Sequence, residues 1–470
     1  MLLHLVRPLA RAALTPPARA LDAALRDPSR AQAHARARVW ESLRDTAYGA
    51  RFPRFEALPL VRWEDVSPWM ARQRAGEPDV VTRERVRFWE PTSGSTGGTP
   101  KHLPYTDSLR GAFSRMFAAW SHDLLAHGPA LRHGTIWFSV TPRFHATVAG
   151  GDGAPVGTAD DRDYLEGPLR ALLAPFVRIP AGLAAERDPE AWRRRLARYL
   201  CAQRDIEVFS VWSPTMLTVL LDWMVAHREE LPNARLVGDW PALWPALRVV
   251  SCWDAGSAAG PAARLRDELG PGVLVQGKGL LATEAPLTIP RVGFPDAGVP
   301  LVHDVVIELL SEVGDLLPVE RAEPGQTYEI VLSQTAGLAR YRLGDIVEAR
   351  GRAHATPGLR FVGRAGAVDL VGEKLTEGAV LAALAAAGAP AGCCLRARGD
   401  HYVLEVDAPA LPEGLAARVE AALCSGHHYR LARDLGQLGP VRAVAVPGRA
   451  ARELDDAPQW GAVKGRVLRG

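Results

Sequence analysis

Apolar residues recur along the chain in short clusters whose spacing changes from one segment to the next. Residues 86–89 alternate as in a strand, 91–100 are rich in turn residues, and 102–105 are extended. Thr106 or Asp107 can then cap a helix. The apolar residues of this predicted helix recur with the spacing of one buried face: Leu109, Phe113, Phe117, Trp120 and Leu124.

The middle of the chain alternates between strand and helix patterns. Residues 206–211 and 247–252 are apolar runs of strand length, and the helix-like segment 214–227 separates them. This alternation predicts a largely parallel sheet covered on both faces. Residues 328–350 then predict two strands around a turn at Gly337. The fold class is therefore α/β, with mixed sheets flanked by helices.

A change of pattern near residue 363 predicts a domain boundary. Beyond it, strand, helix, hairpin and helix patterns follow one another at 369–372, 376–387, 393–406 and 414–438. The 470 residues also exceed the size at which one hydrophobic core usually stops growing. We expect a large amino-terminal domain, residues 1–362, and a small α+β carboxy-terminal domain, residues 363–470.

Composition and charge exclude several classes of protein. Hydrophobic residues make up 47% and charged residues 23%, as in a globular protein. No apolar run reaches the roughly 18 residues that a membrane span needs. The formal net charge of +3 carries no long block of one sign, so we expect no nucleic-acid partner and no membrane partner.

The cysteines and the first residues bear on the compartment. Five cysteines, an odd number without a CxxC pair, predict free thiols in a reducing compartment, and hence a cytoplasmic protein. Residues 1–14 are basic and amphipathic, and no clear cleavage pattern follows them. We expect a helix lying on the large domain, with a targeting segment as the alternative.

Lysine is scarce, and each lysine lies in a stretch that contains glycine. Of 56 basic residues only four are lysines. A compact ammonium is not readily replaced by arginine where it must contact a phosphate or a carboxylate. Four such positions are therefore candidates for chemistry: Lys101, Lys278, Lys374 and Lys464.

The segment that ends at Lys101 is the sharpest local motif. It supplies four hydroxyls and three glycines before the lysine: Thr92, Ser93, Ser95 and Thr96, with Gly94, Gly97 and Gly98. Hydroxyls, close backbone amides and an ammonium can together wrap a polyphosphate. The segment departs from the pattern GxxxxGK[ST], because Pro100 precedes the lysine and His102 follows it. A flexible linker is the alternative.

Two acidic positions complete the candidate site. Glu284 follows Thr283 after a turn-rich stretch, and a carboxylate beside a polyphosphate can hold Mg²⁺. Asp345 ends the stretch RYRLGD, where an aspartate at a strand end can accept the two hydroxyls of a ribose. Each is also an ordinary turn residue when considered alone.

These motifs, in this order, resemble those of the adenylate-forming enzyme superfamily. Within this superfamily, the sequence is most similar to the acyl acid amido synthetases, the auxin-responsive family that has bacterial relatives. The block from GLARYRLGD to GEKLTE narrows the resemblance, and the similar segments TAYGARF, SVWSPTMLTVLL and HHYRLARDLGQLGPV extend it over most of the chain.

The resemblance implies a role for each matching position. The loop residues from Thr92 to Gly98 and Lys101 would bind the phosphates of ATP, next to Thr283, and Glu284 would hold Mg²⁺. Asp345 would bind the ribose. Arg364 would lie at the hinge, Lys464 on the mobile small domain would act in adenylation, and Lys374 would be structural or hinge-related. Relatives often place an aromatic ring against adenine where this chain has Leu280-Leu281.

The implied activity is that of an ATP-dependent ligase. It would activate a small carboxylic acid as acyl-AMP, release pyrophosphate, and transfer the acyl group to an amine, most simply an amino acid. A ligase that uses coenzyme A or a carrier thiol is one alternative, and a degenerate sensor that binds nucleotide or acid is another. Trp212 and Trp253, each at the end of a predicted strand, are candidates for the acyl pocket.

Overall fold

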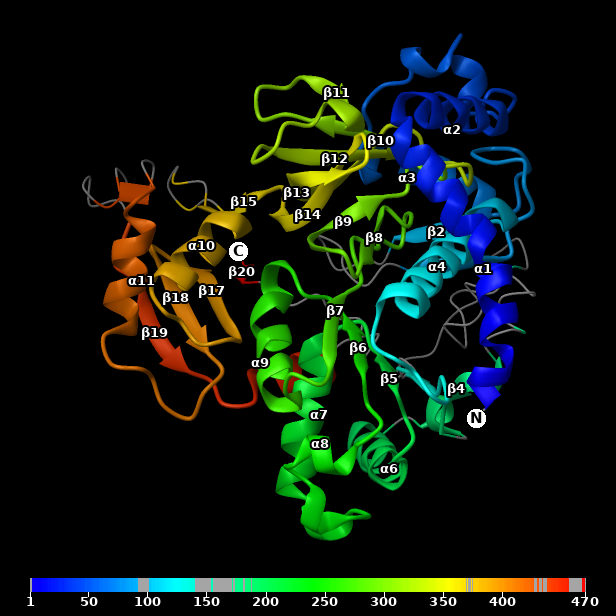
Figure 1. Cartoon of the computed structure of the whole chain (residues 1–470). Helices are drawn as coiled ribbons and strands as arrows, with labels where there is room; N and C mark the ends of the chain where they lie inside the picture. Colours follow the sequence, from blue (N-terminus) through cyan, green and yellow to red (C-terminus); the bar gives the residue numbers. More distant parts are fainter. Residues whose placement is uncertain are drawn as a thin grey trace.

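The computed structural model describes most of the chain. The described residues are 2–91, 101–139, 154, 171, 174–180, 182–186, 188–368, 370, 373, 375–426, 429–430, 433, 438–455 and 467–469. In Figure 1 the elements form three parts: a parallel sheet with its helices, an antiparallel sheet beside the amino-terminal helices, and a carboxy-terminal part to one side. The α/β class expected from the sequence is confirmed.

The amino-terminal helices line one side of the molecule. Helix α1 (Leu2–Arg26) runs beside α4 (Asp107–His127), and α2 (Pro28–Leu43) follows it. The expected helix over the first residues is therefore present. The predicted cap of α4 is also confirmed, because the Thr106 hydroxyl accepts a hydrogen bond from the backbone N–H of Leu109 at 3.4 Å.

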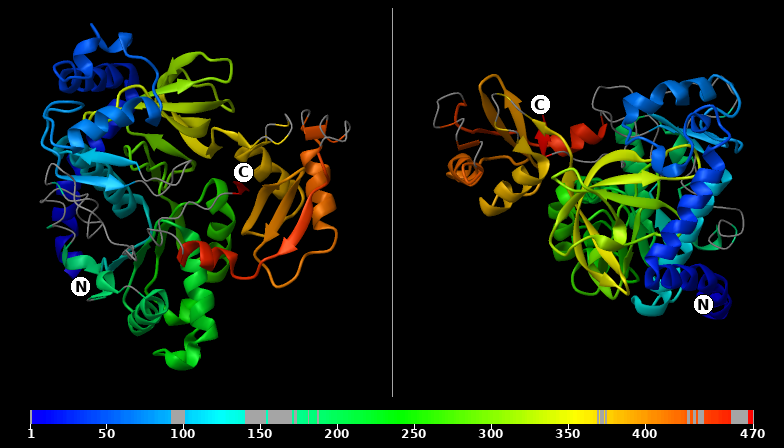
Figure 2. Two further views of the ribbon diagram at one scale, coloured as in Figure 1. Left: turned by 180° about the vertical axis from the view of Figure 1, so that it is seen from behind. Right: turned by 90° about the horizontal axis from the view of Figure 1, so that it is seen from above.

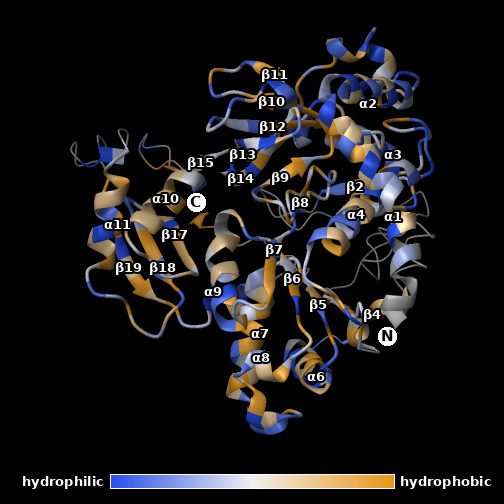
Figure 3. Cartoon of the chain, in the orientation of Figure 1, coloured by the Kyte–Doolittle hydropathy of each residue, from blue (hydrophilic) through white to orange (hydrophobic). Residues whose placement is uncertain are grey.

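A five-stranded parallel sheet forms the centre of another part of the main body. Its order is β4 (Val177–Arg178), β3 (Ile136–Phe138), β5 (Val208–Ser210), β6 (Val249–Cys252) and β7 (Leu274–Gly277), and all neighbouring strands are parallel. Strands β5 and β6 are buried throughout and appear strongly apolar in Figure 3. Three longer helices pack with this sheet in one apolar cluster: α6 (Pro189–Ala202), α7 (Pro214–Ala226) and α9 (Ala259–Leu269).

The main body also contains an antiparallel sheet, which lies beside the amino-terminal helices. Its seven strands are ordered β11 (Leu316–Pro318), β10 (Val306–Leu310), β12 (Thr327–Ser333), β13 (Tyr341–Ala353), β14 (Thr356–Arg364), β9 (Phe294–Pro300) and β8 (Thr288–Arg291). Strands β12 and β13 are the pair that the sequence predicts around Gly337, which has φ +108°. A separate short hairpin, β1 (Phe88–Pro91) with β2 (His102–Tyr105), brackets the segment before Lys101.

The carboxy-terminal residues have an apolar cluster of their own. A four-stranded mixed sheet has the order β19 (Arg442–Ala445), β18 (His401–Val406), β17 (Cys393–Arg398) and β20 (Leu468–Arg469). The helices α10 (Glu377–Ala386) and α11 (Leu415–Leu423) cover it. Figure 2 shows this part standing to one side of the main body. The helix predicted over 414–438 is interrupted: α11 ends at Leu423, a turn follows, and residues 429, 430 and 433 are helical again.

The thiols are free and poorly ionised. All five cysteines are unpaired, as their number predicted, and four of them are buried. Burial raises the pKa of Cys201 and Cys252 to about 12 and that of Cys393 to about 11. Among the residues that the structure describes, no helix is both long enough and apolar enough to cross a membrane.

Candidate active site

Lys101 contacts an aromatic pair at the start of β2. Its ammonium donates a hydrogen bond to the Tyr341 hydroxyl at 2.9 Å, and it lies 5.7 Å from the centre of each of two rings, Trp63 and Tyr341. The lysine therefore meets the first residue of β13, which begins the stretch YRLGD.

Thr283 and Glu284 lie at the tip of a tight turn. Ala282 and Ala285 exchange both backbone hydrogen bonds, at 3.1 and 3.2 Å, so the two residues between them project together. The Tyr105 hydroxyl donates to the Thr283 carbonyl at 2.7 Å and ties this turn to β2, the strand that follows Lys101. The Glu284 side chain is 7% exposed.

Asp345 and Arg364 face each other across β13 and β14. They are register partners, and the Arg364 Nε lies 3.0 Å from Asp345 Oδ1. The Asp345 carboxylate raises the pKa of Arg364, and the Glu284 carboxylate acts in the same direction. Burial raises the pKa of Tyr341, and Glu284 adds to this effect while Arg364 opposes it. These effects mean that Asp345, Glu284 and Arg364 form one electrostatic cluster around Tyr341.

The Asp345 carboxylate is buried and lacks hydrogen bonds. Its side chain is fully buried, and within the described part of the chain neither oxygen accepts a hydrogen bond, because the contact with Arg364 is poorly aligned. A buried acceptor without a donor is costly and calls for an explanation. A ligand that brings two hydroxyl donors is one such explanation.

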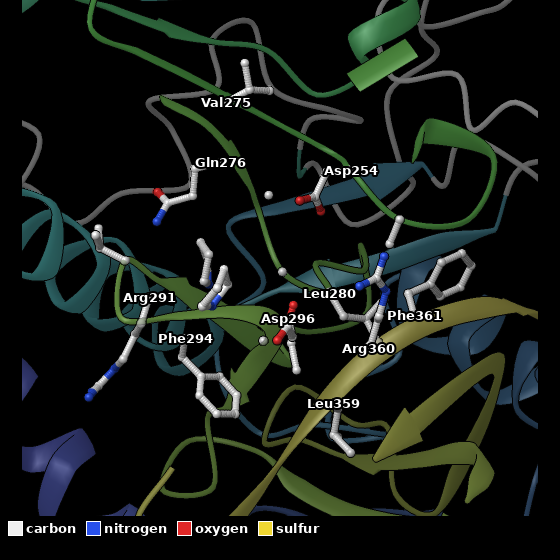
Figure 4. A pocket seen from close by; sticks show the side chains of 18 of the residues that line it. Asp254, Val275, Gln276, Leu280, Arg291, Phe294, Asp296, Leu359, Arg360 and Phe361 are labelled. Carbon is white, nitrogen blue, oxygen red and sulfur yellow. The ribbon is translucent and has the colours of Figure 1, made fainter. Parts of the chain in front are cut away.

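A cavity of about 300 Å³ is lined by residues that lie close in sequence to members of this cluster. It lies between β7, the hairpin of β8 and β9, and β14, and Figure 4 shows its lining. Leu280, four residues before Glu284, and Phe361, three residues before Arg364, line one end of it together with Asp254. Phe294 lines the opposite end.

Two features shape this cavity: the charged groups around Asp254, and the close approach of Gly277 to the Asp254 carboxylate. Burial raises the pKa of Asp254, while the guanidinium groups of Arg266 and Arg360 oppose the shift. The Arg266 guanidinium lies 3.4 Å from the Asp254 carboxylate. A Cβ on Gly277 would come within 2.3 Å of that carboxylate, so only glycine lets the two segments approach. The cavity thus offers an aromatic face beside a polar, partly ionic wall.

Three neighbouring strand ends of the parallel sheet carry a second cluster. Trp212 follows β5, Trp253 follows β6, and Lys278 follows β7 directly. The two indole rings lie 6.0 Å apart, and the backbone N–H of Trp253 donates to the backbone carbonyl of Trp212 at 2.9 Å. The Lys278 ammonium is 5.1 Å from the Trp212 ring and donates to the Ser210 hydroxyl at 2.8 Å. Ligands bind at such carboxyl ends in open α/β sheets.

The structure brings together the predicted residues that it describes. Lys101, Thr283, Glu284, Asp345 and Arg364 share one region, and Trp212 and Trp253 lie side by side. The remaining predicted positions lie outside the described residues: Thr92, Ser93, Gly94, Ser95, Thr96, Gly97, Gly98, Lys374 and Lys464.

Sequence reasoning overlooked several side chains at the site. Trp63, Tyr341, Phe361 and Asp254 were not assigned there, although Tyr341 and Phe361 lie within quoted motifs. Their separation along the chain hides their proximity. In the described residues there is no group of three or more histidine, cysteine, aspartate or glutamate side chains that could hold a metal by itself.

Solved structures define the class of this fold. The chain is similar to the acyl acid amido synthetase AtGH3.15 in complex with 2,4-DB, with a TM-score of 0.83, 18% identity, and coverage of 97% of this chain and 94% of that chain. It is also similar to a 2-hydroxyisobutyryl-CoA ligase in complex with 2-HIB-AMP, with a TM-score of 0.55, 15% identity, and coverage of 94% and 88%. The fold is that of the adenylate-forming enzymes.

Sequence comparisons give the family. Residues 18–234 match the GH3 family N-terminal domain, and residues 305–364 match the GH3 family central domain. A probable indole-3-acetic acid-amido synthetase, GH3.12 of Oryza sativa subsp. japonica, is 27% identical over 395 residues, which cover 65% of this chain and 63% of the rice protein. The chain therefore covers less than two thirds of that relative's length. It belongs to the GH3 family.

Proposed function

We propose that this protein is an ATP-dependent ligase that activates a small carboxylic acid as acyl-AMP and transfers the acyl group to an amine, most simply an amino acid. The observation that carries the proposal is the convergence of Lys101, Glu284, Asp345 and Arg364 around Tyr341. Family membership supports the same assignment. Five free thiols support a reducing, cytoplasmic setting, and the balanced charge gives no reason to expect a nucleic-acid partner.

ATP would lie across this cluster with its phosphates toward Lys101. The hydroxyls and amides of residues 92–98 would join the lysine, and the two ribose hydroxyls would donate to the Asp345 oxygens that lack hydrogen bonds. Because Asp345 is fully buried, the ribose can reach it only if neighbouring groups such as Arg364 move aside. The position of Arg364 at the end of β14 suits a hinge.

We assign the adenine base to the cavity beside Leu280. In this chain Phe361, from β14, would supply the aromatic face that relatives often place at the Leu280 position. The exocyclic amino group of adenine is a donor, and the Asp254 carboxylate on the same wall is an acceptor. The cavity volume of about 300 Å³ is at the lower end of the usual range for ligand pockets.

The residues present suit Mg²⁺ bound together with the nucleotide. This ion prefers one or two carboxylates plus phosphate oxygens and water, and Glu284 is a nearly buried carboxylate at the tip of its turn. When bound, the ion would offset negative charge on the phosphates. Glu284 would hold it, and Thr283, tied to Tyr105, would keep the turn in place.

The chain's own groups account for the first chemical step. An oxygen of the carboxylate substrate attacks the α-phosphorus of ATP, and the bond to pyrophosphate breaks. Lys101 and Lys464 would stabilise the charge that develops on the phosphates. Lys464 lies in a segment that joins α13 (Arg449–Asp455), which packs near α7, to β20. Movement of residues 363–470 would exchange Lys464 for the groups of the second step.

In the second step the amine attacks the acyl carbon and AMP leaves. We place the acid before this step at the ends of β5 and β6, where Trp212 and Trp253 offer flat apolar surfaces. Lys278 and Ser210 would form the polar end of that site. A thiol acceptor is the alternative, and the fold of the 2-hydroxyisobutyryl-CoA ligase is compatible with it. A catalytically inactive sensor that binds nucleotide or acid is the third hypothesis.

The test is exchange of labelled pyrophosphate into ATP, measured with a panel of small aromatic and aliphatic acids. We expect acid-dependent exchange that is lost in Lys101→Ala and Lys464→Ala. Absence of exchange with every acid, together with a thermal shift on adding Mg-ATP, would favour the sensor. Mass spectrometry of products formed with amino acids and coenzyme A offered together decides between the two ligases.

A further inference from the structure

We propose that Trp63 and Tyr341 are positioning residues that hold the ammonium group of Lys101 in place for the phosphates of ATP. This inference rests on the proposed function for its consequence in catalysis, although the contact itself is independent of it. Nζ lies 5.7 Å from both ring centres and donates to the Tyr341 hydroxyl at 2.9 Å. The Trp63 ring supplies a cation–π contact, and Tyr341 contacts the ammonium through its hydroxyl, since the 2.9 Å hydrogen bond by itself accounts for the distance to the Tyr341 ring centre.

A lysine benefits from contacts that restrict its side chain because that side chain is long and flexible. Fixing its four torsions costs conformational entropy each time the ammonium must meet a phosphate. Lys101 lies immediately before β2, which begins at His102. The ring pair restricts the side chain before the nucleotide arrives, and this lowers the cost of binding.

The two rings are fixed relative to each other by backbone pairing. Val61 forms a bridge with Tyr341: its N–H donates to the Arg340 carbonyl at 3.1 Å, and its carbonyl accepts from the Arg342 N–H at 2.8 Å. Trp63 begins helix α3 (Trp63–Arg74) two residues later. The segment before helix α3 is thus held by backbone hydrogen bonds to the strand that carries Tyr341 and Asp345.

Arg340 strengthens the same junction. It is a non-glycine residue with φ +48°, a left-handed conformation that its contacts must maintain. Its guanidinium lies 3.0 Å from the Glu308 carboxylate and donates to the Leu58 carbonyl at 3.1 Å. A strained residue thereby links β10, the segment before α3, and the start of β13. The arrangement resists separation of Trp63 from Tyr341.

Tyr341 also joins the lysine to the carboxylates. The Glu284 carboxylate contributes to the raised pKa of Tyr341, the residue whose hydroxyl accepts the hydrogen bond from Lys101. Tyr341 therefore links the lysine to the acidic part of the site. Trp63 lies outside the motifs that carry the family's chemistry, and its contribution is visible only in the folded structure.

The test uses the scarcity of lysine. Only four lysines are present, so the rate at which an amine-acylating reagent modifies Lys101 can be followed by peptide mass spectrometry, with the other three as internal references. Trp63→Leu removes a cation–π contact and Tyr341→Phe removes the hydroxyl that accepts from the ammonium, and either loss favours the neutral, reactive amine. We expect modification of Lys101 to be about threefold to tenfold faster in Trp63→Leu and Tyr341→Phe, and near the wild-type rate in Trp63→Phe.

A matched control is available on the same helix. Trp69 is also a partly buried tryptophan of α3, but its ring packs against Tyr48, with centres 5.4 Å apart, and lies beneath Arg51. We expect Trp69→Leu to leave the Lys101 rate unchanged. In exchange assays Trp63→Leu should raise KM for ATP severalfold and leave KM for the acid unchanged, and Trp63→Phe should restore it.

The outcomes separate this inference from the proposed function. Equal Lys101 modification rates in wild type and in folded Trp63→Leu, verified by circular dichroism, would overturn the positioning role. An equal acceleration in Trp69→Leu would overturn it too, because it would indicate general loosening. If the wild type lacks exchange activity but the labelling differences appear, the contact stands and the ligase assignment fails.

Discussion

Removing the Phe361 ring tests the assignment of the adenine pocket most directly. Phe361 is the aromatic residue at the end of the cavity near Leu280 and Asp254, and β14 carries it toward Arg364. Phe361→Ala deletes this face and leaves the charged groups of the pocket in place. If the base stacks there, ATP binding loses the stacking energy and little else.

The expected magnitude follows from the partial burial of the ring. Base–aromatic stacking contributes about 1–3 kcal/mol when measured by alanine substitution. This corresponds to a loss of about 5-fold to 150-fold in affinity. Because the Phe361 side chain is only partly buried, we expect about 1–2 kcal/mol of lost folding stability, below the usual range for a buried phenylalanine. The variant should therefore remain folded while ATP binding falls.

The assay is pyrophosphate exchange with ATP and the acid varied separately. We expect KM for ATP to rise about tenfold in Phe361→Ala, with KM for the acid unchanged. Phe294→Ala is the control, since it removes a ring from the opposite end of the same cavity. Leu280→Tyr in the Phe361→Ala background should recover part of the loss. An unchanged KM for ATP, or an equal rise in Phe294→Ala, would refute the assignment.

Three further variants test other parts of the argument. Glu284→Gln should raise the Mg²⁺ concentration needed for half-maximal exchange by at least about tenfold, and an unchanged Mg²⁺ titration would remove this residue from the metal site. Glu207→Gln should lower the free energy of unfolding by about 2–3 kcal/mol, because its carboxylate accepts the backbone N–H groups of Arg132, His133 and Gly134 at 2.6–2.8 Å; urea denaturation measures this. Burial raises the pKa of Asp254, so ionised Asp254 is unfavourable in the folded state at neutral pH. Asp254→Asn should therefore gain stability relative to wild type at pH 7–8, and the gain should disappear as the pH falls below the usual carboxyl pKa of about 4; a difference that is constant with pH would contradict this.

Local sequence patterns predicted a helix correctly where a capping residue is followed closely by apolar residues with helical spacing. Thr106 caps α4 and the apolar face of that helix is buried, because both signals lie within a few residues of each other. The helix predicted over 214–227 appears as Pro214–Ala226 for the same reason. The helix predicted over 414–438 is broken by a turn at Cys424, Ser425 and Gly426, and residues 429, 430 and 433 are helical again. The apolar pattern on either side of these three residues did not reveal the break.

The candidate site was predictable only where a motif carries it. Glu284 and Asp345 stand in short recognisable stretches, so their types and spacing indicated their chemistry. Trp63 and Phe361 act through neighbours that are distant in the chain, and nothing local distinguishes them from core aromatics. The loss of the aromatic at Leu280 pointed to a gap in the adenine site, while the ring that would fill it, on β14, became visible only through the fold.

The buried, poorly ionised thiols make this chain a convenient host for reporter groups. Four of the five are enclosed, and burial also raises the pKa of Cys424, the remaining one. Maleimide dyes attack thiolates, so at neutral pH they would react far faster with a pair of cysteines newly placed on the surface. One on α11 and one on α6 would allow single-molecule energy transfer to follow residues 363–470 during turnover without first removing the native cysteines.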